Sequence, residues 1–567
     1  MKKFNNLPEL FFYQASKLSN KPHLKKINAV TNQIDTHLWK DTLDEVSKVY
    51  QFLDQQKLND FDRVMLVSEN RPEWMISDIA IMSSKLITIP NYTTYTSKDF
   101  QHIIEDSKPN GLIVSNLILL KKIIQASKLN NFNFRFILVM DKFNENLDIQ
   151  NIYFWKNLVS IHNIDFNKYK SLKRTDPSCI IYTSGTQGQP KGVTLSHGGI
   201  LSNCEAADIV LHSIKSDELC FLTWLPLSHS YEHTVQFAQV ALGAITFYND
   251  SIEKLLSTLK IAKPHILTAV PRFYNNLYSK MQLNLSKQSY LKKLLFNKTV
   301  EIGIKVNKQK QISYLEKFLN LLLSFLVRRK IKNQFGGNLI AFVSGGGPLD
   351  SQIGNTLNAL GIKTLQGYGL TETSPVVSCN PLTNIKVETV GPVLPNVEVK
   401  LADDGEILVR GEVLMIGYWN NNEATNEIIK DGWLHTGDIG RFDSDNYLII
   451  TDRKKDIIVS SGGDNISPSK LENLLTLDSK IEQACVFGDN KSYISALLVI
   501  NPQENPNKNE IQNYINNLNL SLSQPEKIKR FKIIEIPFSM ENELLTPTMK
   551  VRRHKVYEQY KELIDSM

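Results

Sequence analysis

The chain has 567 residues, of which 42% are hydrophobic and 22% charged, and its formal net charge is +7. This composition is typical of soluble globular proteins and excludes collagen-like, disulfide-scaffold and wholly disordered classes. Because one hydrophobic core rarely serves so long a chain, we expect two to four structural units. The charge excess does not indicate a nucleic-acid partner, because no zinc-finger, RRM or KH signature and no aromatic-interleaved basic patch accompanies it.

Targeting signals and cysteine chemistry are not indicated. No apolar run approaches the roughly 18 to 20 residues that span a bilayer. The amino terminus carries Lys2 and Lys3 but not the apolar core of a signal peptide. The five cysteines are scattered and form no CxxC pair, so they predict neither a zinc site nor a disulfide framework. We therefore expect a cytoplasmic protein whose cysteines are small buried side chains.

The first part of the chain alternates helical and strand periodicities. Apolar residues at three- and four-residue spacing predict a helix over 43–53, and a second helix is expected over 73–81. Short apolar runs predict buried strands at 63–67, 86–90, 112–114 and 134–140. Strands that alternate with helices form parallel sheets covered on both faces, so the pattern predicts an α/β fold.

The periodicity changes several times further along. Residues 141–174 have no clear period and predict an irregular connection, whereas 282–332 are rich in Lys and Leu and predict helices. Strands are expected in a smaller β-rich region at 406–410 and 447–451. A small α+β domain should then begin near Asp452, with its expected elements being a helix over 467–477, strands over 483–488 and 494–501, and a further helix.

The sharpest motif is YTSGTQGQPKG, residues 182–192, which follows a predicted strand. Its glycines allow the backbone to turn N–H groups inward, and its hydroxyls and lysine add donors, as a polyphosphate would require. The donors and turn residues are Thr183, Ser184, Gly185, Thr186, Gly188 and Lys191. The motif differs from the GxxxxGK[ST] loop of P-loop NTPases. Taken alone, it is also compatible with an ordinary surface loop.

Six further blocks follow this loop in a fixed order. The seven together are YTSGTQGQPKG (182–192), SGGGPL (344–349), QGYGLTE (366–372), GEILVRGEVLMIGYW (405–419), WLHTGDIG (433–440), TDRKKDIIVSSGGDNISP (451–468) and LTPTMKVRR (545–553). In this order they resemble the acyl-adenylate-forming superfamily, which includes acyl-CoA synthetases, non-ribosomal adenylation domains and firefly luciferase. The resemblance covers nearly the whole chain.

The resemblance implies a two-part α/β architecture. A large domain, residues 1–451, should contain two parallel-sheet α/β subdomains and a distorted β-barrel. A hinge at 452–455 should lead to a small mobile α+β domain, residues 456–567. Lys455 occupies the hinge position, and Gly462 and Gly463 would flank a channel for CoA.

The resemblance also assigns a nucleotide site. Glycines after a strand would let an adenine edge approach the backbone without Cβ atoms in the way. Tyr368 would stack on the base, although a half-buried core tyrosine is equally compatible with the sequence. Asp438 would accept hydrogen bonds from the ribose hydroxyls, although alone it reads as a turn residue. The residues that the resemblance assigns to this part of the nucleotide site are Gly345, Gly346, Gln366, Gly367, Tyr368, Gly369, Thr371, Asp438 and Arg453.

The implied catalytic residues are Lys550, Glu372 and His229. Glu372 would hold Mg²⁺ together with the Thr183 hydroxyl, since Mg²⁺ prefers a few protein oxygens plus phosphate oxygens. Lys550 would compensate the charge that develops when a carboxylate attacks the α-phosphorus. Read singly, these residues could instead be a solvated lysine in a basic run, a helix-capping glutamate and a loop histidine.

Local details resemble the long-chain fatty acyl-CoA synthetase branch, among them NRPEW at 70–74 and the DRKKD hinge. We therefore expect a ligase that uses ATP, Mg²⁺ and CoA to convert a fatty acid to acyl-AMP and then acyl-CoA. Two alternatives remain: an acyl-AMP ligase or acyl-ACP synthetase with another acceptor, and a non-catalytic, membrane-associated fatty-acid binding or uptake module. Gln187 and Ile450 depart from the residues usual in the family, and no motif reports acyl-chain length or oligomeric state.

The predicted helices of residues 282–332 include an amphipathic stretch whose apolar face could be covered in two ways. Apolar residues recur from Tyr314 to Phe325, and a basic run from Arg328 to Lys332 follows them. We expect this face to be buried against the large domain. The alternative is peripheral contact with the inner face of an anionic membrane.

Overall fold

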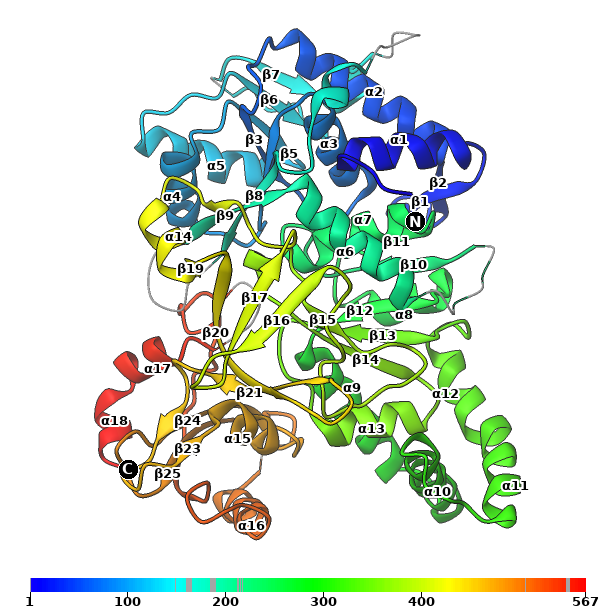
Figure 1. The fold of residues 1–567 in the computed structure, drawn as a ribbon, viewed down its shortest axis with the longest axis vertical. Helices are drawn as coiled ribbons and strands as arrows, with labels where there is room; N and C mark the ends of the chain where they lie inside the picture. Colours follow the sequence, from blue (N-terminus) through cyan, green and yellow to red (C-terminus); the bar gives the residue numbers. More distant parts are fainter. Residues whose placement is uncertain are drawn as a thin grey trace.

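The computed structural model describes residues 2–147, 149–159, 166–183, 190–211, 214, 216, 218–504, 506–546 and 551–567. Two eight-stranded sheets with helices on their faces form most of the molecule, and an antiparallel sheet and a C-terminal α+β part complete it (Figure 1). Among these residues, no helix combines the length and the hydropathy needed to cross a membrane. All five cysteines are buried and unbridged, as expected.

The first sheet contains the strands predicted in the N-terminal part. Its order is β18-β9-β8-β4-β3-β5-β6-β7. The strands are β3 (Arg63–Val67), β4 (Ile87–Asn91), β5 (Gly111–Val114), β6 (Phe136–Val139), β7 (Ile152–Phe154), β8 (Pro177–Thr183), β9 (Lys191–Ser196) and β18 (Gly417–Tyr418). The helices of this part are α1 (Leu7–Lys17), α2 (Trp39–Gln55), α3 (Pro72–Ser83), α4 (Ser97–Ser107) and α5 (Leu117–Leu129). The pairings from β8 through β7 are parallel, which confirms the α/β prediction.

The second sheet has the order β15-β14-β13-β12-β10-β11-β1-β2 and is parallel from β14 to β1. Its strands are β1 (Pro22–Ile27), β2 (Ile34–Leu38), β10 (Cys220–Thr223), β11 (Ile245–Tyr248), β12 (Ile266–Ala269), β13 (Ala341–Ser344), β14 (Lys363–Tyr368) and β15 (Ser378–Cys379). The helices among them are α6 (His197–Val210), α7 (Ser230–Ala241), α8 (Leu255–Ala262) and α13 (Ser351–Ala359).

The β-rich region is a five-stranded antiparallel sheet beside these two. It comprises β16 (Val397–Leu401), β17 (Glu406–Gly411), β19 (Ile429–Lys430), β20 (Trp433–Phe442) and β21 (Leu448–Arg453), with α14 (Asn422–Ile428) between β18 and β19. The two strands predicted here, 406–410 and 447–451, are confirmed within two residues at each end.

The C-terminal part has its own sheet and its own hydrophobic clusters. Its elements are β22 (Ile458–Val459), β23 (Asn465–Ile466), α15 (Pro468–Leu475), β24 (Ile481–Phe487), β25 (Ile494–Ile500), α16 (Lys508–Asn519), β26 (Ile528–Ile533), α17 (Arg553–Gln559) and α18 (Lys561–Asp565). This arrangement confirms the predicted α+β character of the region after Asp452. The α/β fold class is therefore correct for the whole chain.

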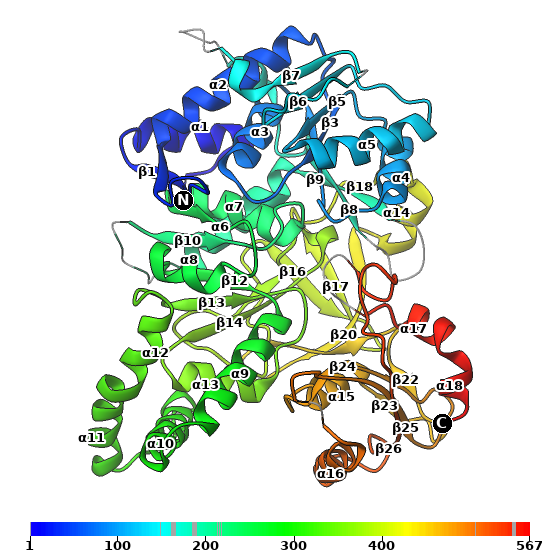
Figure 2. The same ribbon diagram turned by 180° about the vertical axis from the view of Figure 1, so that it is seen from behind.

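A helical arm projects from the second sheet (Figures 1 and 2). It consists of α9 (Pro271–Ser286), α10 (Tyr290–Asn307), α11 (Tyr314–Leu323), a π-helical turn (Ser324–Arg328) and α12 (Arg329–Gln334). The expectation that the apolar face of this segment is buried is wrong. Tyr314 is 89% exposed and Phe318 64%. The arm packs through α10 onto α13, and this contact leaves the outer face of α11 in solvent.

Candidate active site

A cavity of about 2550 Å³ lies where the second sheet, the antiparallel sheet and the C-terminal part meet. Most of the residues that the sequence singled out line it. They are Thr183, His229, Gly345, Gly346, Gln366, Gly367, Tyr368, Gly369, Thr371, Glu372, Asp438, Arg453 and Lys455. Because these residues come from distant parts of the chain, the fold itself assembles the site.

The glycine-rich loop is described only at its two ends. Thr183 ends β8 and pairs in register with Lys191, the first residue of β9. Thr183 lines the cavity, and the Lys191 ammonium lies 5.0 Å from the centre of the Tyr418 ring. Six residues named in the sequence analysis, five from this loop and the lysine expected to be catalytic, lie outside the described residues; they are Ser184, Gly185, Thr186, Gln187, Gly188 and Lys550.

Glycines form one wall of the cavity because other residues would not fit. A Cβ on Gly369 would lie 1.7 Å from the carbonyl oxygen of Pro375, and one on Gly345 would lie 3.1 Å from the ring of Tyr231. Gly346 has φ +80°, a left-handed conformation that favours glycine. The glycines after β13 and β14 are therefore required by packing and by backbone conformation.

Gln366 holds this wall in place. Its Oε1 accepts the N–H of Leu349 at 3.1 Å, and its Nε2 donates to the Val387 carbonyl at 2.7 Å. Both ends of the side chain are thus bound to backbone groups. Although the sequence grouped Gln366 with the nucleotide-binding residues, these contacts position the turn after β13.

Tyr368, Asp438 and Arg453 form a connected group. The Tyr368 hydroxyl donates to Asp438 Oδ2 at 2.7 Å, and Arg453 Nε lies 3.2 Å from Asp438 Oδ1. Asp438 and Arg453 face each other across β20 and β21. Burial, together with the charge of Asp438, raises the pKa of Tyr368, so its hydroxyl stays protonated and donates. The group presents a fixed carboxylate at the cavity wall.

Glu372 lies in a 3₁₀ turn, Thr371–Thr373, directly after β14. Its Oε1 accepts a hydrogen bond from the Tyr418 hydroxyl at 2.8 Å, and Thr371 Oγ1 lies 3.0 Å from Ser230 Oγ. Burial and the charge of Glu372 raise the pKa of Tyr418. Tyr418 lies inside a motif that the sequence already marked, but its role as the support of Glu372 depends on the fold and was missed.

Two of the predicted site residues offer the oxygen donors that a hard cation prefers. Within the described residues, no cluster of three or more His, Cys, Asp or Glu side chains could hold a metal on its own. A carboxylate and a hydroxyl, from Glu372 and Thr183, line the same cavity. This donor set fits Mg²⁺, which keeps a few protein oxygens and takes the others from phosphate or water.

The first turn of α7 contributes a histidine and a buried acid. His229 is the N-cap of the helix, and its Nδ1 accepts the N–H of Tyr231 at 3.1 Å. Glu232 is fully buried, and its Oε2 accepts from Thr268 Oγ1 at 2.7 Å. Burial raises the pKa of Glu232 to about 7. Sequence reasoning missed Glu232, although it stands three residues after His229 and lines the cavity.

Both exposed and paired groups line the C-terminal side of the cavity, where Arg553 Nη1 lies 2.6 Å from Glu472 Oε1. Lys455 is exposed in the turn after β21, and Lys454 pairs with Glu406 Oε2 at 3.2 Å. Thr546 and Val551, which stand on either side of 547–550, both line the cavity. Gly462 and Gly463 are exposed between β22 and β23 and are not part of the cavity wall.

Comparisons with known proteins agree with this arrangement. Residues 11–419 match the family model described as AMP-binding enzyme, and 455–567 match the AMP-binding enzyme C-terminal domain. The chain is 31% identical over 532 residues to the long-chain-fatty-acid–CoA ligase FadD15 of Mycobacterium bovis, covering 89% of this chain and 88% of that one. It is 28% identical to long chain acyl-CoA synthetase 4 of Arabidopsis thaliana, covering 99% and 91%.

Solved structures have the same fold. The anthranilate CoA ligase AuaEII in complex with anthranoyl-AMP superposes with a TM-score of 0.79 at 19% identity, covering 100% of this chain and 99% of that one. The o-succinylbenzoate CoA synthetase MenE of Bacillus subtilis, in complex with ATP and magnesium ion, gives 0.70 at 19% identity, covering 96% and 98%. The chain belongs to the AMP-binding enzyme family.

Proposed function

We propose that the protein is a long-chain or medium-chain fatty acid–CoA ligase. It would use ATP to convert a fatty acid to acyl-AMP with release of pyrophosphate, and would then transfer the acyl group to CoA with release of AMP. The observation that carries the proposal is the single cavity that brings together Thr183, the glycine wall, Glu372 and Asp438. The relatives named long-chain-fatty-acid–CoA ligase and long chain acyl-CoA synthetase support the substrate class.

In the first step an oxygen of the fatty acid carboxylate attacks the α-phosphorus of ATP, and the bond from that phosphorus to the pyrophosphate oxygen breaks. Two anions must approach each other, so fixed cations have to compensate their charge. A bound Mg²⁺ would supply Lewis-acid charge compensation to the phosphate oxygens. Thr183 and Glu372 would hold it, and Lys550 would add an ammonium. Support for Lys550 comes from its neighbours Thr546 and Val551, which line the cavity.

The nucleotide would be positioned by groups that the fold already holds. Asp438, fixed by Tyr368 and Arg453, would accept hydrogen bonds from the ribose hydroxyls. The glycine wall after β13 would receive the adenine ring beside Tyr368. Because these groups are already hydrogen-bonded or ion-paired to neighbouring side chains, they would lose little freedom when ATP binds.

The remaining space would take the acyl chain. At about 2550 Å³ the cavity is larger than the roughly 300–1000 Å³ of ordinary small-molecule sites. Part of its lining is apolar and comes from α6, α7 and the second sheet. These side chains are Ala207, Val210, Leu211, Phe221, Val235 and Ala238. An alkyl chain bound against these apolar side chains would place its carboxylate near His229 and near the phosphates of the bound ATP.

For the second step we propose that the domain division is 1–451 and 456–567, with a hinge at 452–455. Rotation about Lys455 would withdraw Lys550 and bring Gly462 and Gly463 to the channel through which the CoA thiol enters. The thiol sulfur would then attack the acyl-AMP carbonyl carbon, and AMP would leave. The separate clusters of the C-terminal part support the view that it moves as one body.

The test is to incubate the purified full chain with ATP, Mg²⁺ and palmitate, with and without CoA, and to measure pyrophosphate, AMP and thioester. The proposal expects AMP and palmitoyl-CoA only when CoA is present. Pyrophosphate without any thioester would favour an acyl-AMP ligase or acyl-ACP synthetase. Binding of palmitate without pyrophosphate release would favour a non-catalytic binding module. A panel of acids from acetate to oleate would then define the preferred chain length.

A further inference from the structure

The outer face of the helical arm concentrates exposed apolar side chains. Of the 28 large apolar residues that the described chain leaves exposed, seven lie within residues 314–326. They are Tyr314, Leu315, Phe318, Leu321, Leu322, Phe325 and Leu326, with exposed fractions between 41% and 89%. At helical spacing they cover one continuous side of α11 and the turn after it. On an ordinary protein surface exposed apolar residues are scattered singly, whereas these form one contiguous patch.

The opposite side of the arm is fixed to the body, so the apolar face points outward. A Cβ on Gly303 of α10 would lie 2.6 Å from the Cβ of Ala359, which shows how closely α10 packs on α13. Arg328 donates to the carbonyl of Ala359 at 2.7 Å and to that of Asn320 at 3.1 Å. These contacts attach the arm to α13, and the apolar side of α11 remains exposed among the described residues.

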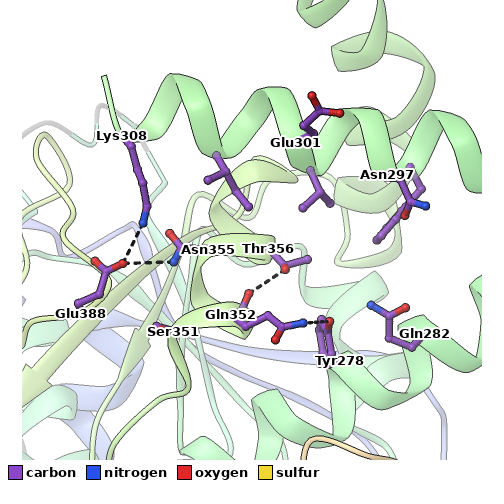
Figure 3. Close-up of a pocket in the computed structure, with 13 residues that line it drawn as sticks. Tyr278, Gln282, Asn297, Glu301, Lys308, Ser351, Gln352, Asn355, Thr356 and Glu388 are labelled. Atoms are coloured by element: carbon purple, nitrogen blue, oxygen red, sulfur yellow. Dashed lines mark hydrogen bonds and ion pairs between the residues drawn. The ribbon is translucent and has the colours of Figure 1, made fainter. Parts of the chain in front are cut away.

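Figure 3 shows the root of the arm, where α10 lies across α13. Lys308 Nζ lies 3.2 Å from Glu388 Oε1, and Gln352 Nε2 donates to the Tyr278 hydroxyl at 3.0 Å. A cavity of about 550 Å³ lies here, and Ser351 and Glu388 line both this cavity and the large one. The arm is therefore anchored next to the proposed catalytic cavity.

The arm also carries the positive charge of the molecule. Residues 280–332 contain thirteen lysines and arginines but two glutamates, whereas the whole chain has 65 basic and 58 acidic residues. The rest of the chain therefore has 52 basic and 56 acidic residues and is slightly negative. Lys317, Arg329 and Lys330 are exposed beside the apolar face. Apolar side chains flanked by such cations are complementary to an anionic lipid headgroup layer.

We propose that the part of the arm formed by residues 280–332 is the surface by which the protein docks on an anionic phospholipid bilayer. The apolar side of α11 enters the boundary between headgroups and acyl chains, and the flanking lysines and arginines contact the lipid phosphates. Association of two copies through the same face would bring two strongly positive arms together, which charge repulsion disfavours. The proposal goes beyond the ligase activity and does not depend on it.

The test compares vesicles of phosphatidylcholine alone with vesicles of phosphatidylcholine and phosphatidylglycerol, using co-sedimentation of the full chain. One double variant, Leu321→Glu with Phe325→Glu, alters the apolar face. A second, Arg329→Glu with Lys330→Glu, alters the charge. A matched control, Ile118→Glu with Leu129→Glu, places the same charges on α5, where the two side chains are 77% and 62% exposed. Thermal melting checks that every variant is folded.

We expect the wild type and the α5 control to bind the phosphatidylglycerol vesicles at least ten-fold more tightly than the neutral ones, and added salt to weaken this binding. The charge variant should bind these vesicles about ten-fold or more weakly, since each basic residue near an anionic surface contributes about five-fold. The variant of the apolar face should also bind about ten-fold or more weakly, because its glutamates cannot enter the boundary between headgroups and acyl chains. Equal binding to both vesicle types, or arm variants that bind like the wild type, would overturn the proposal. So would a lipid-free dimer that the Leu321 and Phe325 changes dissociate, because the face would then be an interface between copies.

Discussion

The two sides of the large cavity are built differently. On the side of the sheets, the two acidic groups expected to bind ligand are held by neighbours, Asp438 by Tyr368 and Glu372 by Tyr418. On the C-terminal side, Lys455 is exposed in a turn, and the lysine expected to act stands in the sequence between Thr546 and Val551, which line the cavity. In the proposed function, the first side recognises a nucleotide, and the second delivers and withdraws a charge.

This difference explains how one cavity could serve two reactions. Groups fixed by hydrogen bonds bind the same ligand portion in both steps, whereas a group on a separate body acts only when that body is in place. If the comparison holds, substitutions on the C-terminal side should separate the two half-reactions. Substitutions on the sheet side should instead weaken nucleotide binding in both.

The largest effect is expected for Lys550→Ala. Loss of the ammonium should lower the rate of acyl-AMP formation by about 10²–10³-fold, because a fixed charge that stabilises a transition state is worth that much. Thioester formation from added acyl-AMP should be nearly unchanged. Pyrophosphate release and thioester formation, measured separately, test this. Lys555→Ala is the control in the same basic run, and an equal fall in both half-reactions would contradict the division of roles.

Lys455→Pro should act in the opposite sense. Proline fixes φ and so prevents the backbone rotation that the hinge needs. We expect acyl-AMP formation to remain within a few-fold of the wild type and thioester formation to fall by about 100-fold, the size typical of a displaced catalytic group. Lys455→Ala removes the charge but keeps the backbone free, so it should retain both steps. An unchanged overall rate in the proline variant would exclude Lys455 as the hinge.

Asp438→Asn tests the fixed side of the cavity. A hydrogen bond to a charged acceptor contributes about 1.5–3 kcal/mol, so the KM for ATP should rise by about 10- to 100-fold. Both half-reactions should retain their rates at saturating nucleotide. Asp443→Asn makes the same charge change at an ion pair with Lys386 outside the cavity and should leave the KM unchanged. A fall in kcat without a change in KM would argue against a binding role for Asp438.

The last prediction concerns the stability of the fold rather than activity, and it rests on Glu232. Burial raises its pKa from 4.5 to about 7, so the folded protein retains a proton that the unfolded chain releases between these values. Stability should therefore fall as pH rises through this window, by up to about 3 kcal/mol, and change no further above it. Glu232→Gln removes this dependence. The difference in melting temperature, variant minus wild type, should grow from pH 5 to pH 7; a constant difference would mean that Glu232 is ionised throughout.

The local sequence predicted many of the elements that position the site. Strand β3 and helix α2 follow from apolar periodicity, because a half-buried helix and a fully buried strand impose different spacings on neighbouring residues. The ordered motifs also predicted which residues meet, since Thr183, Glu372 and Asp438 all reach one cavity. What periodicity could not supply is the partner of each side chain, such as Tyr418 for Glu372.

The apolar face of α11 makes the same distinction clear. Its amphipathic pattern was read correctly from the sequence, but the pattern is identical whether the face meets protein, lipid or water. Contacts between α10 and α13, which are some fifty residues apart in the chain, turn the apolar face of α11 away from the rest of the molecule.

The sequence by itself determined the alternation of strands and helices, the order of the motifs and the family to which they point. Only the tertiary structure decided that Glu232 is buried with a raised pKa, that Gln366 holds backbone groups, and that α11 is exposed. The physical reason is that periodicity and turn chemistry act between near neighbours. Burial, electrostatic environment and the choice of partner arise from contacts between residues far apart in the chain.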